Sequence, residues 1–138
     1  MAAYNKFQQF TKDQIDGVHD FDGHTFKIML TNSSPVNTNT VKANLTEISS
    51  GNGYTSGGTS IANVGTASGG TFTLVGTDVT FTASGGSIGP FRYAIVYNDT
   101  PTSPADPLIC YFDYGSAVTL LDTETITVDF GASLFTQS

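Results

Sequence analysis

The sequence has little positive charge. Its 138 residues contain five Lys and Arg against twelve Asp and Glu, which gives a formal net charge of −7 at pH 7. Proteins that bind nucleic-acid backbones need clustered cations, because binding is driven by the release of counterions. This composition therefore predicts that nucleic acid is not a partner.

Cysteine is almost absent, and tryptophan is missing altogether. The single Cys110 excludes an intrachain disulfide, so the fold does not depend on an oxidising compartment. Cys110 lies in the apolar run 108–112, where we expect a small buried hydrophobic residue and not a reactive thiol. With 38% hydrophobic residues, the chain can bury a core without disulfide or metal support, and we expect one domain over 1–138.

Long apolar runs are also missing. No stretch approaches the roughly 20 apolar residues that cross a bilayer, and the start MAAYNKF has no apolar signal-peptide core. We expect a soluble protein that neither enters a membrane nor leaves the cell by conventional secretion.

The middle of the chain lacks charge of either sign. Between Glu47 and Arg92, the only Asp, Glu, Lys or Arg is Asp78. Ser, Thr, Asn and Gly take the place of charged residues, which suits strands paired with neighbours or surfaces covered by other subunits.

The most regular pattern lies at 79–98. The run 79–84 alternates apolar and polar residues, as half-buried strands do, and in the β-patterned run 92–97 Tyr93 and Tyr97 share a face. The segment GGSIGP at 85–90 joins them, because its glycines tolerate positive φ and Pro90 fixes φ where the next strand begins. This segment predicts a corner between two strands.

One helix is expected, over about residues 4–18, from the apolar stripe of Phe7, Phe10, Ile15 and Val18. Whether it docks on its own sheet or on a neighbouring subunit stays open. The spacing of Val41, Leu45 and Ile48 permits a short helical turn or a loop, and the glycine-rich stretch 49–58 predicts a loop.

Short β-patterned runs, most of them separated by glycine, proline or aspartate, make up the rest of the chain. The run 108–114 is apolar on both faces, which is typical of a central strand or of a subunit interface. These runs predict a mainly β, antiparallel, jelly-roll-like β-sandwich, with a helix and turn at 1–22, the sandwich at 23–131 and a tail at 132–138. The expected strands are 25–31, 59–64, 71–75, 78–83, 92–97, 108–114, 117–121 and 125–130.

Residues 85–89 match G-x-S-x-G, the nucleophile elbow of α/β-hydrolases, with Ser87 as the nucleophile. That motif needs a helix after the serine and a histidine later in the chain. Here Pro90 and a strand follow, and His19 and His24 lie upstream. The motif therefore does not predict a hydrolase.

A group of metal-ligand residue types follows the expected helix, but its spacing fits no known site. In an EF-hand register Val18 and Met29 would occupy ligand positions, and the two histidines are not at i, i+4. A solvated turn is the preferred interpretation, and Asp122 and Glu124 likewise indicate a hairpin turn. The sequence nominates no catalytic, cofactor-binding or metal-binding residue. The group consists of Asp16, His19, Asp20, Asp22 and His24.

Four segments of the chain follow one another in a characteristic order: FKIMLTNSSPVNTNTVKANLTEISSGNGYTSGG, VTFTASGGSIGPFRYAIVYNDT, PLICYFDYGSAVTL and ETITVDF. This order resembles a family of small virion structural proteins of tailed bacteriophages, found as head or capsid-associated components. The resemblance covers roughly residues 4–131, and it is most specific at GNGYT and SGGSIGPFRYAIVYNDT. The chain departs from relatives at Cys110 and Tyr111, where they commonly carry aromatic residues, and in the lengths of its glycine loops.

The resemblance implies a non-enzymatic virion protein, assembled in the bacterial cytoplasm, that binds the major capsid protein as a decoration or cement protein on the outer shell. Because capsid lattices offer three-fold positions, a homotrimer is the favoured oligomer. A tail or neck structural protein is one alternative. A carbohydrate-binding or receptor-binding module is another, with exposed tyrosines stacking on sugar rings; these would be Tyr54, Tyr93, Tyr97 and Tyr114.

Interface residues are expected among the aromatic side chains of two strands, together with the sole arginine. Aromatic anchors carry much of the binding energy at protein interfaces. The arginine is expected to pair with a carboxylate or cap strand carbonyls, and a direct interface role is the alternative. The candidates are Phe91, Arg92, Tyr93, Tyr97 and Tyr111.

Overall fold

The computed structural model describes residues 3–131 and 133–137 and is mainly β, with antiparallel strands and one short α-helix. This confirms the predicted fold class. The elements are β1 Ala3–Lys6, α1 Gln8–Ile15, β2 Phe26–Thr31, the 3-10 turn η1 Lys42–Asn44, β3 Thr59–Ile61, β4 Asn63–Ser68, β5 Thr71–Gly76, β6 Val79–Thr82, β7 Ile88–Asn98, β8 Leu108–Leu120, β9 Thr125–Val128 and β10 Phe135–Gln137.

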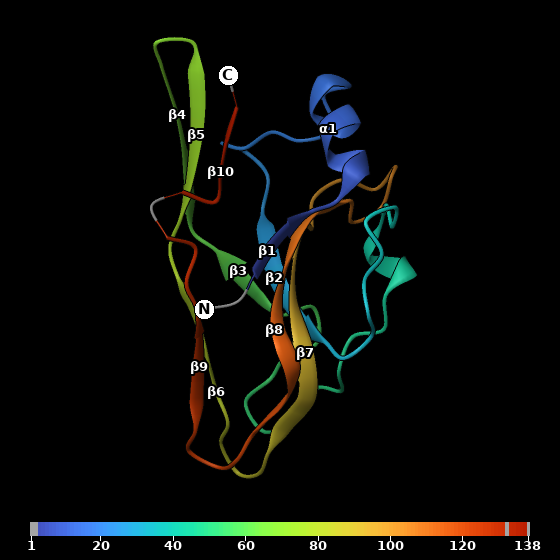
Figure 1. Cartoon of the computed structure of the whole chain (residues 1–138), viewed down its shortest axis with the longest axis vertical. Helices are drawn as coiled ribbons and strands as arrows, with labels where there is room; N and C mark the ends of the chain where they lie inside the picture. Colours follow the sequence, from blue (N-terminus) through green and yellow to red (C-terminus); the bar gives the residue numbers. More distant parts are fainter. Residues whose placement is uncertain (1–2, 132, 138) are drawn as a thin grey trace.

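The main sheet has five strands in the order β1-β8-β7-β2-β3 (Figure 1). β8 lies between β1 and β7, so the run that is apolar on both faces is an internal strand. The predicted strands 108–114 and 117–121 are wrong as separate elements, because the chain continues through Gly115 at a φ of +85°. A glycine tolerates this conformation, and β8 therefore continues without a break.

The N-terminal prediction is wrong for residues 4–6, since β1 pairs with β8 and places Tyr4 opposite Phe112. The helix covers only Gln8–Ile15, and Gly17 follows it with a φ of +76°. Sheet pairing between segments more than 100 residues apart overrides the local helical spacing.

The second layer consists of a three-stranded sheet, β10-β5-β4, and a two-stranded sheet, β6-β9. Figure 1 shows β4 and β5 above β6 and β9 on one side of the main sheet. β10 lies within the predicted tail 132–138, so that part of the tail is a strand and the prediction is corrected. Its pairing with β5 is again long-range.

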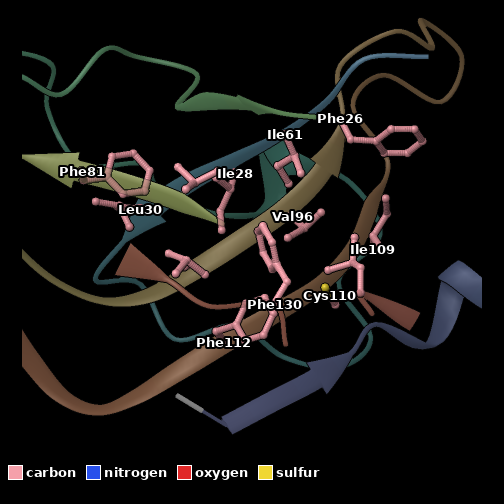
Figure 2. Packing of buried hydrophobic residues seen from close by; sticks show 14 of the residues in the cluster. Phe26, Ile28, Leu30, Ile61, Phe81, Val96, Ile109, Cys110, Phe112 and Phe130 are labelled. Carbon is pink, nitrogen blue, oxygen red and sulfur yellow. The ribbon is translucent and has the colours of Figure 1, made fainter. Parts of the chain in front are cut away.

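The principal core fills the space between the main sheet and the second layer. Alternate residues of β2 (Phe26, Ile28 and Leu30) face this core, as their period of two predicts, and meet Phe81 and Phe130 from the other side (Figure 2). Cys110 is fully buried there, which confirms its prediction, and burial raises the pKa of its thiol.

The opposite face of the main sheet is covered by the chain itself. Met29, Ile95 and Tyr97 form a second buried cluster with Phe7, and Leu45 packs against it from the segment between β2 and β3. Figure 1 shows this segment beside β7, and η1 is the short helical turn that was one of the two possibilities left open by the sequence. Both faces of the main sheet are therefore buried within one chain.

Candidate interaction surfaces

The structure separates the predicted interface residues into two groups. Phe91 is fully buried in the principal core, and Tyr97 is 1% exposed on the other face of the sheet. The Tyr97 hydroxyl donates a hydrogen bond to the Gly57 carbonyl at 2.5 Å, so a loop of the same chain covers this side chain. Neither residue is available to a partner in the folded chain, and both are corrected as interface candidates.

The other three candidates lie close together, and with Asp113 they form what we call the Arg92 patch. Arg92 and Tyr111 are partly exposed, whereas Tyr93 is buried and is corrected as an interface candidate. Arg92 binds Asp113 in two places, with Nε at 2.9 Å from Oδ1 and Nη2 at 3.2 Å from Oδ2. Its guanidinium lies 5.3 Å from the centre of the Tyr93 ring, which is 6.1 Å from the Tyr111 ring. The predicted pairing of Arg92 with a carboxylate is therefore confirmed.

The Arg92 patch favours the ionised form of the Asp113 carboxyl group. Hydrogen bonds from Arg92 and from the backbone N–H of Gly115 lower the pKa of Asp113 below its ordinary value. Tyr93 is 7% exposed, whereas Tyr111 is half-buried and hydrogen-bonds Asn37 at 3.2 Å. The patch is thus a planar cation stacked on an aromatic ring, with its charge already paired.

The expected sugar-stacking platform is not formed. Tyr54 is 3% exposed, and with Tyr93 and Tyr97 also buried, only half-buried Tyr114 remains of the four predicted rings. The hydroxyl of Tyr54 accepts a hydrogen bond from the Leu30 N–H at 3.0 Å and donates one to Glu47 at 2.5 Å. Tyr54 therefore fastens a loop to β2.

Glu47 lies at the centre of these contacts, a role that no pattern in the sequence indicates. One carboxylate oxygen accepts from Tyr54 and from the Gly57 N–H, while the other lies 3.4 Å from Lys42 Nζ. Only 11% of the Glu47 side chain is exposed. The carboxylate therefore joins η1, the glycine-rich loop and β2.

We expect Tyr54→Phe to lower the free energy of unfolding by about 1–3 kcal/mol, because the buried Leu30 N–H and Glu47 lose a partner. Tyr114→Phe is the matched control, since the Tyr114 hydroxyl is buried and has no hydrogen-bond partner among the described residues. Denaturant unfolding of both variants measures the difference. Equal losses of stability would contradict this role for Tyr54.

The histidines predicted to lie in a solvated turn instead contact a buried amide. Nδ2 of Asn98, which is fully buried, lies 3.0 Å from Nδ1 of His19 and 2.9 Å from Nδ1 of His24. Because the amide N–H groups donate, both Nδ1 atoms accept and both rings carry their proton on Nε2. The described residues contain no group of three His, Cys, Asp or Glu side chains that could hold a metal ion.

The turn at His19 makes stability depend on pH. Burial lowers the pKa of His19 from 6.5 to about 4, against the opposing charge of Asp13. Between these values the unfolded chain binds a proton that the folded chain does not, so stability falls as the pH drops from 6.5 towards 4. We expect His19→Asn, which keeps an acceptor for Asn98, to reduce this slope by at most about 1.4 kcal/mol per pH unit. Unfolding curves across this window measure it, and an unchanged slope would refute it.

Ser87 lies in the connection between β6 and β7, and Asp122 and Glu124 lie in the connection between β8 and β9. Each of these two chain crossings joins the main sheet to the second layer. Ser87 is exposed and its carbonyl accepts from Asn52 Nδ2 at 2.9 Å. Asp122 accepts from the Gly85 N–H at 2.9 Å, and Glu124 accepts from the Leu121 N–H at 2.7 Å. The predicted corner is confirmed, but the hairpin is wrong, because β8 and β9 belong to different sheets.

The second layer presents an uncharged outer surface, which we call the threonine face. On β5, β6 and β9 its side chains alternate with residues that enter or pack against the core, and none of the outward residues of β4, β5, β6 and β9 carries a charge. Thr80 and Thr127 join β6 and β9 through their hydroxyls at 2.9 Å. The threonine face comprises Val64, Thr66, Ser68, Thr73, Val75, Thr80, Thr82, Thr125 and Thr127.

Comparison with protein-family models, with curated proteins and with solved structures finds no match. Within residues 3–131 and 133–137, no helix is both long and apolar enough to cross a membrane.

Proposed function

We propose that this chain is a non-enzymatic structural protein of a bacteriophage particle, and that it decorates the outer surface of the assembled capsid by binding the major capsid protein. The observation that carries the proposal is the threonine face. Interface cores are depleted of charged residues, and here a whole sheet surface of an otherwise acidic protein is free of them. The resemblance of the segment order to phage virion proteins supports the same role.

The construction of the domain suits a protein that adds to a shell. Both faces of the main sheet are buried by the chain itself, so the domain can fold before it meets the capsid. Three copies around a three-fold position are the favoured arrangement on a lattice. The Arg92 patch offers a second, polar contact, because its guanidinium and Tyr111 remain partly accessible.

Reconstruction of virions by cryo-electron microscopy tests the location. Density for this fold on the outer shell at local symmetry axes supports the proposal, and density confined to the tail or neck would identify the alternative structural role. A protein that binds only the assembled shell stabilises it by mass action. Particles without the chain should therefore release DNA at a lower temperature, and identical release curves would argue against a cement role.

A receptor-binding or carbohydrate-binding role is the weaker candidate. The tyrosine rings expected to stack on sugars are mostly buried and held by hydrogen bonds from within the chain. Host adsorption by particles that lack the chain distinguishes this role, since a decoration protein leaves adsorption unchanged.

A further inference from the structure

The second layer ends in a strand edge that the described chain leaves uncovered. In the order β10-β5-β4, one side of β4 has no neighbouring strand, and Figure 1 shows it on the outside of the β4–β5 hairpin. β4 has six residues, whereas the other edge strands of the two larger sheets have three or four. β1 carries Lys6, and Gln137 of β10 bonds Gln14 of α1 at 2.6 Å. β4 is therefore the longest of these edges.

The backbone groups on this edge can be assigned from the hairpin. Gly69 and Gly70, with φ of +59° and +81°, form a two-residue loop closed by Ser68 and Thr71, so this closing pair faces inward and exchanges hydrogen bonds. Because the direction of the backbone groups alternates along a strand, the N–H and C=O groups of Asn63, Gly65 and Ala67 point away from β5, towards the free edge. The Leu74 carbonyl, which accepts from Leu134 N–H, confirms this pattern, because Leu74 pairs with Gly65 and faces β10.

The edge lacks Lys, Pro and a bulge, three features by which proteins protect exposed strands. Such strands usually carry Lys or Pro, or a bulge that interrupts the edge. β4 reads NVGTAS, and its register with β5 is continuous from Asn63 to Ser68. Beside the edge, Val64 and Val75 form a cross-strand pair with 62% and 43% of their surfaces exposed. An edge of this kind is suited to pairing with another strand.

The distribution of charge favours a second copy of this chain as the partner at this edge. All Asp, Glu, Lys and Arg residues except Asp78 lie outside 48–91, so a basic partner would find its best site elsewhere on the acidic surface. Two chains of net charge −7 repel each other over that remainder. The β4 edge is where identical chains meet with the fewest like charges opposed.

We propose that two copies pair through β4, antiparallel about a two-fold axis that passes through Thr66. In this register Gly65 of each copy lies opposite Ala67 of the other, and their outward backbone groups hydrogen-bond across the junction. Val64 packs beside Ser68 of the other copy on the threonine face.

This inference does not rest on the capsid role. The contact is isologous, so the same surface serves both copies, and it differs from a contact that closes a three-fold ring. On a shell it would link neighbouring decorations across local two-fold axes. The solution experiments below contain no capsid, so they can fail while decoration is retained, and the reverse also holds.

Disulfide trapping with Thr66→Cys tests the register directly. The two positions form a non-hydrogen-bonded pair with Cα atoms about 4.5 Å apart, which suits a disulfide. Under oxidised glutathione, which accepts the two electrons and two protons, we expect covalent dimer to form about ten-fold or more faster than in a Thr125→Cys control, because pairing raises the effective thiol concentration. Cys110 is fully buried and does not compete. Equal rates in the two variants would overturn the proposal.

Sedimentation of the full chain supplies the second test. We expect the unmodified protein to reach twice its 14.5 kDa mass as concentration rises, and Thr66→Lys to remain at the single-chain mass because two like charges would face each other at the axis. Thr125→Lys, at an exposed threonine on β9, should dimerise like the unmodified protein. A protein that stays monomeric at high concentration, or an assembly that Thr66→Lys leaves unchanged, would refute pairing through β4.

Discussion

Gly58→Ala is expected to lower the free energy of unfolding by about 3 kcal/mol or more, which for a domain of this size removes a large part of its stability. A Cβ at this position would lie 1.9 Å from the Ile28 carbonyl oxygen and 2.9 Å from the Met29 Cα. Both are backbone atoms of β2, a strand within the main sheet, so neither can move without disturbing the sheet. Denaturant unfolding measures the loss.

Gly57→Ala is the matched control. Both glycines have positive φ, +93° at Gly57 and +80° at Gly58, so both variants carry the backbone strain of about 1–2 kcal/mol. At Gly57 the nearest atom to a new Cβ is the Tyr97 hydroxyl oxygen at 3.6 Å, an ordinary contact. The difference between the variants therefore isolates the clash with β2, and equal stabilities would show that the loop does not lie against that strand.

Phe91→Ala is expected to cost about 3–5 kcal/mol, because it empties a fully buried aromatic site in the principal core. Arg92→Ala, one residue further along β7, should cost far less, since its ion pair with Asp113 is partly exposed and solvent-screened. Thermal and denaturant unfolding of the two variants provide the comparison.

The same two variants distinguish an effect on folding from an effect on binding to the particle. Arg92→Ala keeps the fold, so any loss of particle binding by this variant reports on the Arg92 patch itself. If Phe91→Ala retained full stability and lost only partner binding, Phe91 would face a partner, and its placement in the core would be wrong.

Local pattern predicted much of this fold. The alternation of Val79 and Phe81 with threonines placed both residues in the core, where they are 5% and 4% exposed. The apolar surroundings of Cys110 predicted its burial, and the scarcity of cations predicted that Arg92 would find a carboxylate. These features depend on neighbours in sequence or on overall composition, both of which can be read directly.

The errors have a common physical origin in long-range contacts. Alternation shows that Tyr93 and Tyr97 share a face, but not that the segment between β2 and β3 covers it. The spacing of Phe7 and Phe10 fits a helix, yet residues 3–6 pair with β8. Glu47 gave no specific signal beyond its position just before the charge-free stretch, because its partners are set by the folded loop.

The two chain crossings at one end of the layers have a mechanical consequence. The corner after β6 and the turn after β8 are bonded to each other, with the Ala83 N–H donating to the Glu124 carbonyl and the Thr123 N–H donating to the Ala83 carbonyl, each at 2.9 Å. Two adjacent connections that are hydrogen-bonded to each other oppose twisting of one layer relative to the other more than a single connection would. A force that shears the two layers is therefore shared between both connections. At this end of the domain the layers are less free to rotate relative to each other than they would be with a single linker.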